Sequence, residues 1–177
     1  MYCIRRAVEA DIEGIARVHV DTWRTAYTGI MPAERLANLS YERSSGQWLH
    51  SIRSGRGFID VAEEAGEIVG FASSGAERNH VTGYDSEVYA LYVLAAYQGQ
   101  GIGRELVRSA AKELWDRGYQ TMLIWVLEDN TSARHFYEKM GGVLIEDKLY
   151  YPLGGDTHLV EVGYGYQISE LIGDKIP

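Results

Sequence analysis

Three features of this sequence predict an α+β fold. Apolar residues recur at helical spacing in several segments, two pairs of strand-like segments flank short turns, and one strand-like segment leads through a glycine-rich turn into a helix. The expected order is β-α-α-β-β-β-α-β-α-β-β, without internal repeats, low-complexity segments or a linker. The chain of 177 residues fits one domain, residues 1–177, with a sizeable core.

The N-terminal half is expected to begin with a short strand, residues 2–8, and a helix over residues 11–22. The apolar face of that helix holds Ile12, Ile15, Ala16, His19 and Val20. An aromatic, loop-like stretch over residues 23–29 precedes a second helical region, which opens near Pro32 and has a break near Ser40. The apolar face of that region holds Leu36, Leu39, Trp48 and Ile52. Residues 58–63 and 68–74 then form a hairpin.

The C-terminal half is expected to alternate strands and helices. A central strand over residues 87–93 precedes a helix over residues 102–117, which ends at Gly118. The core face of this helix holds Ile102, Leu106, Ala110 and Leu114. A buried strand over residues 121–127 is followed by a helix that Asn130 or Thr131 caps. Residues 143–151 and 158–166 form a final strand pair around a turn at residues 152–156.

Composition excludes several classes of protein. The net charge is −8, and no basic cluster longer than Arg5-Arg6 occurs, so a nucleic-acid partner is not expected. No apolar run is long enough for a membrane span, and the charged N-terminus lacks the apolar region of a signal peptide. The lone Cys3 is expected to be a buried strand residue in a cytoplasmic protein.

A glycine-rich turn over residues 98–104 is the most informative motif. Glycines alternate at Gly99, Gly101 and Gly103 between a strand and a helix, where free backbone amides form a site for phosphate. No Lys-Ser or Lys-Thr follows, which excludes the Walker loop, and Arg104 stands where the dinucleotide fingerprint needs glycine. The pattern Gln/Arg-x-x-Gly-x-Gly/Ala fits at Gln98. It resembles the acetyl-CoA-binding motif of the GNAT superfamily of N-acetyltransferases.

A second motif supports this resemblance. Residues 130–141 are similar to the GNAT pattern Asn-x-x-Ala-x-x-x-Tyr-x-x-x-Gly, with Asn130, Ala133, Tyr137 and Gly141 in register. The two motifs follow successive strands in the correct order, and the order of elements matches the GNAT fold from end to end. The resemblance implies a mixed, largely antiparallel sheet with helices on both faces. Two parallel strands in its centre would splay to form a slot for acetyl-CoA.

The resemblance also implies which residues bind acetyl-CoA, the only cofactor expected. The backbone of Leu91 and Val93 would meet the pantetheine amides like an added strand, with Val93 near the acetyl carbonyl. The pyrophosphate would lie against the turn formed by Gln98, Gly99, Gln100, Gly101, Ile102, Gly103 and Arg104. Asn130, Ala133 and Tyr137 belong to the second motif of the same site.

Two residues are candidates for catalysis. Tyr137 is the general acid in many relatives, because a phenol near sulfur can protonate the thiolate leaving group; the alternative is a core aromatic residue. Glu87 is the candidate base. It lies six residues before Val93, and in a regular strand Glu87, Tyr89, Leu91 and Val93 share one face. The alternative is a solvated glutamate at the strand end.

The acceptor is less well defined by the sequence. Trp23 and Tyr27, in the expected loop after the first helix, could form an aromatic wall for a cation or pack against the sheet. With Glu87 they are the candidate substrate-binding residues. The five histidines show no metal-ligand spacing, so no metal is expected, and His135 is expected on a helix surface.

Three functions remain open at this level. The first is acetyl transfer from acetyl-CoA to a primary amine of a small molecule, by direct attack in a ternary complex. The second has a protein N-terminus or a lysine as acceptor. The third is a non-catalytic acyl-CoA-binding sensor module. The oligomeric state is open as well, and a homodimer is one option.

Overall fold

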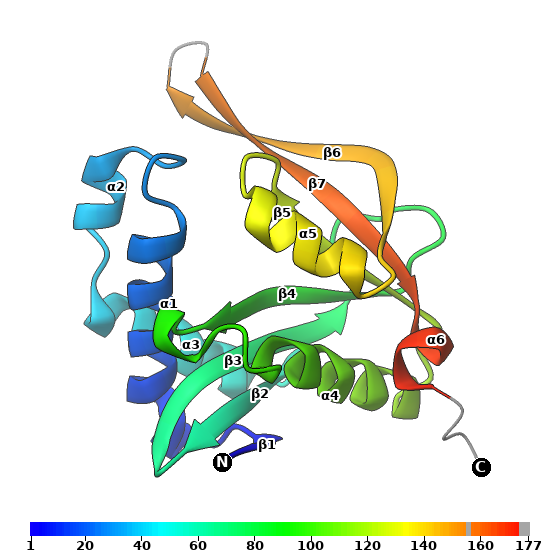
Figure 1. Ribbon diagram of the computed structural model, residues 1–177, viewed down its shortest axis with the longest axis horizontal. Helices are drawn as coiled ribbons and strands as arrows, with labels where there is room; N and C mark the ends of the chain where they lie inside the picture. The colour runs from blue at the N-terminus through cyan, green and yellow to red at the C-terminus, as the bar shows by residue number, and fades with distance from the viewer. Residues whose placement is uncertain (155–156, 174–177) are drawn as a thin grey trace.

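The computed structural model describes residues 1–154 and 157–173 as a seven-stranded sheet with helices on both faces (Figure 1). The strand order is β1-β2-β3-β4-β5-β7-β6, and only β4 and β5 are parallel neighbours. The strands are β1 (Tyr2–Arg6), β2 (Gly57–Glu64), β3 (Glu67–Ala76), β4 (Ser86–Val93), β5 (Thr121–Leu127), β6 (Val143–Gly154) and β7 (Thr157–Gln167). This mixed, largely antiparallel sheet confirms the predicted fold class.

The helices cover the two faces of the sheet differently. They are α1 (Ile12–Ala26), α2 (Ala33–Ala37), α3 (Tyr41–Ser54), α4 (Ile102–Asp116), α5 (Thr131–Lys139) and α6 (Ile168–Ile172), with short 3-10 turns at Glu9–Asp11 and Ala95–Tyr97. Helices α1 and α3 pack on one face through a core that includes Ile15, Val18 and Phe71. Helices α4 and α5 pack on the other face, around Val107, Met122 and Tyr164. The acetyl-CoA slot expected between β4 and β5 therefore lies between two helical layers.

Most expected elements are confirmed, with a few corrections. Helix α1 continues to Ala26, so residues 23–26 are helical, and only residues 27–29 of the expected loop stretch lie outside the helix. The break expected near Ser40 is confirmed, because the Ser40 side chain accepts a hydrogen bond from the Arg43 amide and caps α3. Helix α6 was not predicted. Cys3 is exposed on β1, so its expected burial is wrong. The turn expected at residues 152–156 extends outside the described residues.

An irregularity in β4 overturns one expectation about faces. Ser73 and Ser74 of β3 pair with Ala90 and Val88, so Tyr89 has no partner opposite it and forms a β-bulge. An extra residue reverses the alternation of side chains along the strand. Leu91 and Val93 therefore pack on the α4 side, whereas Tyr89 and Glu87 line a cavity on the opposite side. The expectation that Glu87 shares a face with Leu91 and Val93 is wrong.

Candidate acetyl-transfer site

The glycine-rich turn leaves a row of backbone amides free. Gly99 and Gly101 adopt φ values of 74° and 87°, which L side chains rarely adopt. Gly101 is the N-cap of α4 and supplies no side chain to the helix end. Within the described residues, the first backbone bond of the helix is donated by the Glu105 amide to Gly101, and none of the amides of residues 99–104 donates to a protein acceptor. With Arg104 exposed beside them, these amides fit an anionic pyrophosphate.

The strands beside this turn diverge. β4 and β5 pair only at residues 86–88 with residues 122–124, although β4 continues to Val93 and β5 to Leu127. β4 stays paired with β3 to its end, where the Leu94 amide donates to Val69, and the Gln98 side chain occupies the Val93 carbonyl at 2.9 Å. The facing edges beyond Val88 are thus left for an extended, amide-bearing ligand. This confirms the splayed arrangement that the sequence implied.

Tyr137 lies on α5 beside this opening. Its side chain is 6% exposed, and its ring lies 5.3 Å from that of Phe136 and 6.0 Å from that of Tyr164. Burial raises the pKa of the Tyr137 hydroxyl, and the neighbouring Tyr92 raises it further. A phenol that holds its proton so firmly is protonated at neutral pH. The second motif also caps the helix, because the Asn130 side chain accepts from the Ala133 amide at 3.2 Å.

Helix α1 presents an aromatic stripe to the opposite face of the sheet. His19, Trp23 and Tyr27 are spaced one helical turn apart, and their rings meet edge-on at 5.2 Å and 5.1 Å. The His19 ring also stacks on Tyr92 at 5.5 Å. Burial raises the pKa of both the Tyr27 and Tyr92 hydroxyls. Because Tyr27 interacts electrostatically with Tyr92 and Tyr137, the stripe reaches the same region as the expected general acid.

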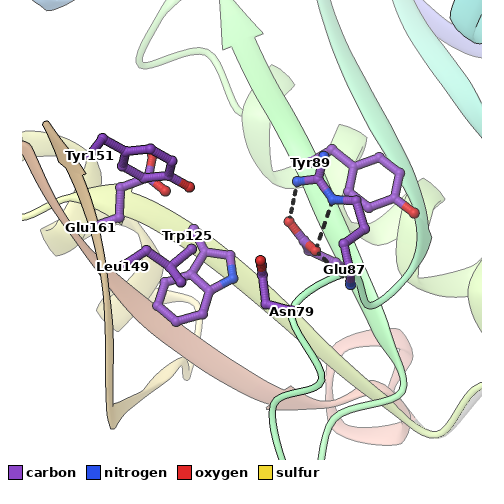
Figure 2. Close-up of a pocket in the computed structure, with 8 residues that line it drawn as sticks. Asn79, Glu87, Tyr89, Trp125, Leu149, Tyr151 and Glu161 are labelled. Atoms are coloured by element: carbon purple, nitrogen blue, oxygen red, sulfur yellow. Dashed lines mark hydrogen bonds and ion pairs between the residues drawn. The ribbon is translucent and has the colours of Figure 1, made fainter.

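A cavity of about 290 Å³ adjoins this region, and Figure 2 shows the side chains that surround it. Its lining residues are Arg78, Asn79, Glu87, Tyr89, Trp125, Leu149, Tyr151 and Glu161. One wall comes from β4 and the loop before it, and the other comes from β5, β6 and β7. The cavity is thus assembled from segments that are far apart in the sequence.

Glu87 is held in this cavity by Arg78. Its side chain is 1% exposed, and Arg78 Nη2 lies 2.5 Å from Oε1 while Arg78 Nε lies 3.2 Å from Oε2. The Arg78 amide also donates to Oε2 at 3.3 Å. The Arg78 guanidinium in turn covers the Tyr89 ring at 4.0 Å. Both carboxylate oxygens of Glu87 are therefore already in use.

Glu161 on β7 is a second carboxylate in the cavity, which the sequence analysis missed. Burial raises the pKa of its carboxyl, and the nearby Glu87 raises it further, whereas a hydrogen-bonding interaction with Tyr151 and the charge of Arg78 lower it. Glu161 also influences Tyr27 and Tyr92. The sequence offered one signal for Glu161, namely a glutamate inside the otherwise apolar strand segment Leu-Val-Glu-Val. This signal was not sufficient, because the position of that strand in the sheet was not known from the sequence.

Three further expectations concern metal binding, His135 and membrane spans. Among the described residues, no group of three His, Cys, Asp or Glu side chains is placed to hold a metal ion. His135 is exposed on α5, as expected. In the same part of the chain, no helix has the length and apolar character required to cross a membrane.

Comparison with known proteins identifies the family. The sequence model of the acetyltransferase (GNAT) family matches residues 14–142. The chain belongs to the GNAT family. It is 38% identical over 166 residues to the uncharacterized N-acetyltransferase YuaI of Bacillus subtilis, covering 94% of this chain and 93% of that protein. The protein is thus an acetyl-CoA-dependent acyltransferase.

Solved structures support the fold of this GNAT protein. An N-acetyltransferase from Staphylococcus aureus Mu50 superposes with a TM-score of 0.74 at 21% identity, covering 96% of this chain and 99% of that one. The structure of yncA from Salmonella typhimurium with its cofactor acetyl-CoA gives a TM-score of 0.71 at 22% identity and covers 96% of this chain and 95% of that one. At these identities the likeness concerns the fold alone.

Proposed function

We propose that this GNAT protein transfers the acetyl group of acetyl-CoA to a primary amine of a small molecule, by direct attack in a ternary complex. One arrangement carries the proposal. The free amides of residues 99–104 adjoin the splayed edges of β4 and β5, and Tyr137 lies beside that opening. A pyrophosphate, a pantetheine and a thioester would occupy these three places in the order in which acetyl-CoA carries them.

Each part of the cofactor has a matching group in the chain. Residues 99–104 bind the pyrophosphate through backbone amides, and the guanidinium of Arg104 adds positive charge. Gln98 begins the turn, but its own amide donates to Ala95 and its side chain donates to Val93. The backbone of Leu91 and Val93 hydrogen-bonds the pantetheine, with Val93 nearest the acetyl carbonyl. Asn130 and Ala133 fix the start of α5, which sets the position of Tyr137.

Tyr137 is then the general acid. The amine attacks the carbonyl carbon of the thioester, the C–S bond breaks, and the leaving thiolate takes the phenolic proton. The position of Tyr137 beside the opening supports this role, and not its pKa, because burial raises the pKa of the hydroxyl and so makes it a weaker acid. The phenolate is re-protonated by solvent or by the proton that the amine loses.

The reaction also requires a base that accepts a proton from the acceptor amine. A typical amine has a pKa near 10 and arrives protonated, so a proton acceptor is required. Glu87 is the candidate from sequence, but its carboxylate oxygens accept hydrogen bonds from Arg78. Proton transfer to Glu87 would have to proceed through water and compete with this ion pair.

The dimensions of the acceptor region favour a small molecule. The cavity of about 290 Å³ is comparable to the smallest pockets that hold small ligands, about 300 Å³. A protein N-terminus or a lysine side chain could also enter through the open side, and this is the alternative acceptor class.

The test is a screen for thiol release from acetyl-CoA with four groups of acceptors: polyamines, aminoglycosides, amino acids and peptides. We expect turnover with a small amine, and turnover lower by about 10²–10⁴-fold with Tyr137→Phe. Turnover restricted to peptides would replace the small-molecule proposal with protein acetylation. Acetyl-CoA binding by calorimetry without turnover of any acceptor would contradict the proposed catalysis.

A further inference from the structure

Each wall of the cavity has a carboxylate and at least one aromatic ring, but only one wall has a cation beside its carboxylate. The wall on β4 has the carboxylate of Glu87 and the ring of Tyr89, and Arg78 satisfies both. The opposite wall has the carboxylate of Glu161 with the rings of Trp125 and Tyr151. Figure 2 shows Tyr151 beside Glu161, with Trp125 between that group and Glu87.

Glu161 lacks the cation that Glu87 has. None of the ion pairs in the described part of the chain includes Glu161. Arg78 is near enough to act on it electrostatically, but its hydrogen bonds go to Glu87. The interactions with Tyr151 and Arg78 compensate only part of the hydration that this partly buried carboxylate has lost, because no cation pairs with it directly. The charged side chains that line the cavity, Arg78, Glu87 and Glu161, therefore leave one negative charge over.

Electrostatic interactions connect Glu161 with the region around Tyr137. Tyr92 and Tyr27 interact with both Tyr137 and Glu161, whereas Glu161 itself interacts with Glu87 and Arg78. The cavity therefore lies within electrostatic reach of the expected general acid. An acceptor whose amine lies near Tyr137 would direct its other end toward Glu161.

We propose that Glu161, Trp125 and Tyr151 form a subsite for a second ammonium group of the acceptor, which is therefore an aliphatic diamine or a longer polybasic amine. This inference rests on the proposed acetyl transfer to a small amine. The distal ammonium pairs with the Glu161 carboxylate and lies against the two aromatic rings, as the Arg78 guanidinium does with Glu87 and Tyr89 on the opposite wall. The second charge thus selects the acceptor, while the first amine reacts.

The experiment compares three acceptors of one length: 1,4-diaminobutane, 1-aminobutane and 4-aminobutanoate. For the wild-type protein we expect KM for the diamine to be at least about 10-fold lower than for the monoamine, and 4-aminobutanoate to be the poorest, since a charged hydrogen bond has this effect. Glu161→Gln should raise KM for the diamine about 10-fold or more. The KM of this variant for 1-aminobutane should stay within about 2-fold of the wild-type value. Glu146→Gln, an exposed glutamate on β6, is the matched control and should change neither.

Several outcomes would overturn the subsite. Equal KM values of the wild-type protein for the diamine and the monoamine would overturn the subsite, and this result needs no variant. A loss of kcat in Glu161→Gln that is equal for both amines would instead assign Glu161 to the reacting amine.

Failure of the proposed function is distinguishable. If no acceptor is turned over, the subsite can still be tested by calorimetry of 1,4-diaminobutane binding to the protein saturated with coenzyme A. Binding that Glu161→Gln weakens about 10-fold supports the subsite, and absence of binding to the wild-type protein overturns it.

Discussion

The proposed cofactor half of the site and the proposed acceptor half are built in opposite ways. The cofactor half uses backbone groups of a continuous segment, residues 91–104, with one helix that follows the next strand. The acceptor half uses side chains from α1, β4, β5, β6 and β7, including Trp23, Tyr92, Trp125 and Glu161. Backbone groups bind a ligand that is the same throughout a family, whereas side chains can be exchanged to bind different acceptors.

The difference has a physical basis. Backbone amides at a helix start are free whatever the side chains are, provided that glycines permit the turn. Side chains that face a cavity are constrained only by volume, burial and charge, so their identity can change with the ligand. Substitutions in the two halves should therefore have separable effects on the cofactor and on the acceptor.

The largest effect is expected for Tyr137→Phe, which keeps the ring and removes the proton. Loss of a general acid should lower kcat by about 10²–10⁴-fold with little change in acetyl-CoA binding. Single-turnover kinetics and calorimetry measure the two quantities. If kcat stays within a few-fold of wild type while chemistry limits turnover, Tyr137 is a packing residue.

The next effect concerns the stability of the acceptor half at low pH. Burial lowers the pKa of His19 from 6.5 to about 4. The unfolded chain therefore binds a proton at a higher pH than the folded protein does. The contribution of His19 to the free energy of unfolding is therefore fully present above pH 6.5. It decreases as the pH falls from 6.5 to 4, by up to about 3 kcal/mol in total.

The variant His19→Gln isolates this contribution. It should be less stable at neutral pH, because His19 Nδ1 accepts from Trp48 Nε1 at 3.2 Å. Its free energy of unfolding should nevertheless depend less on pH than that of the wild type, as measured by urea denaturation. Parallel pH curves for the two proteins would show that His19 is not the group that titrates.

Gly101→Glu tests the backbone-built half. The substitution places a side chain and a negative charge where the amides meet pyrophosphate, at a φ of 87°. Acetyl-CoA affinity should fall by at least about 2 kcal/mol, roughly 30-fold. Gly118→Glu is the control, because Gly118 has a φ of 95° just beyond the other end of α4. Unchanged acetyl-CoA binding in folded Gly101→Glu would refute the pyrophosphate site.

Glu87→Gln separates a base from a structural ion pair. The base hypothesis predicts that the variant needs a higher pH for activity. Because Arg78 already binds both oxygens, we expect the free energy of unfolding to fall by about 1–3 kcal/mol and the pH–rate profile to keep its shape. A profile displaced to higher pH would restore Glu87 as the base.

The smallest effect is expected for Trp23→Ala. Loss of one aromatic face should raise the acceptor KM by the equivalent of about 0.5–2 kcal/mol and affect the acetyl-CoA KM less. Steady-state kinetics with each substrate varied in turn measures both. An equal rise of the two KM values would show that Trp23 supports the sheet rather than the acceptor.

The sequence alone determined the fold class and the order of most strands and helices, and it predicted the cofactor half of the site. These features depend on local signals. Residues 102, 106, 110 and 114 repeat at helical spacing and are all buried on α4, and the glycines of residues 99–103 permit the turn wherever the chain is placed. The second motif located Tyr137 for the same reason, since its spacing fits one face of a short helix.

Only the tertiary structure decided the acceptor half. The bulge at Tyr89 reversed the alternation in β4 and moved Glu87 away from the face of Leu91, because register depends on the pairing with β3 and not on the strand itself. Helix α1 extended past its expected end and brought Trp23 and Tyr27 to Tyr92. Glu161 became a candidate only when β7 lay beside β5, since the charge of a cavity is the sum over segments that the linear sequence keeps apart.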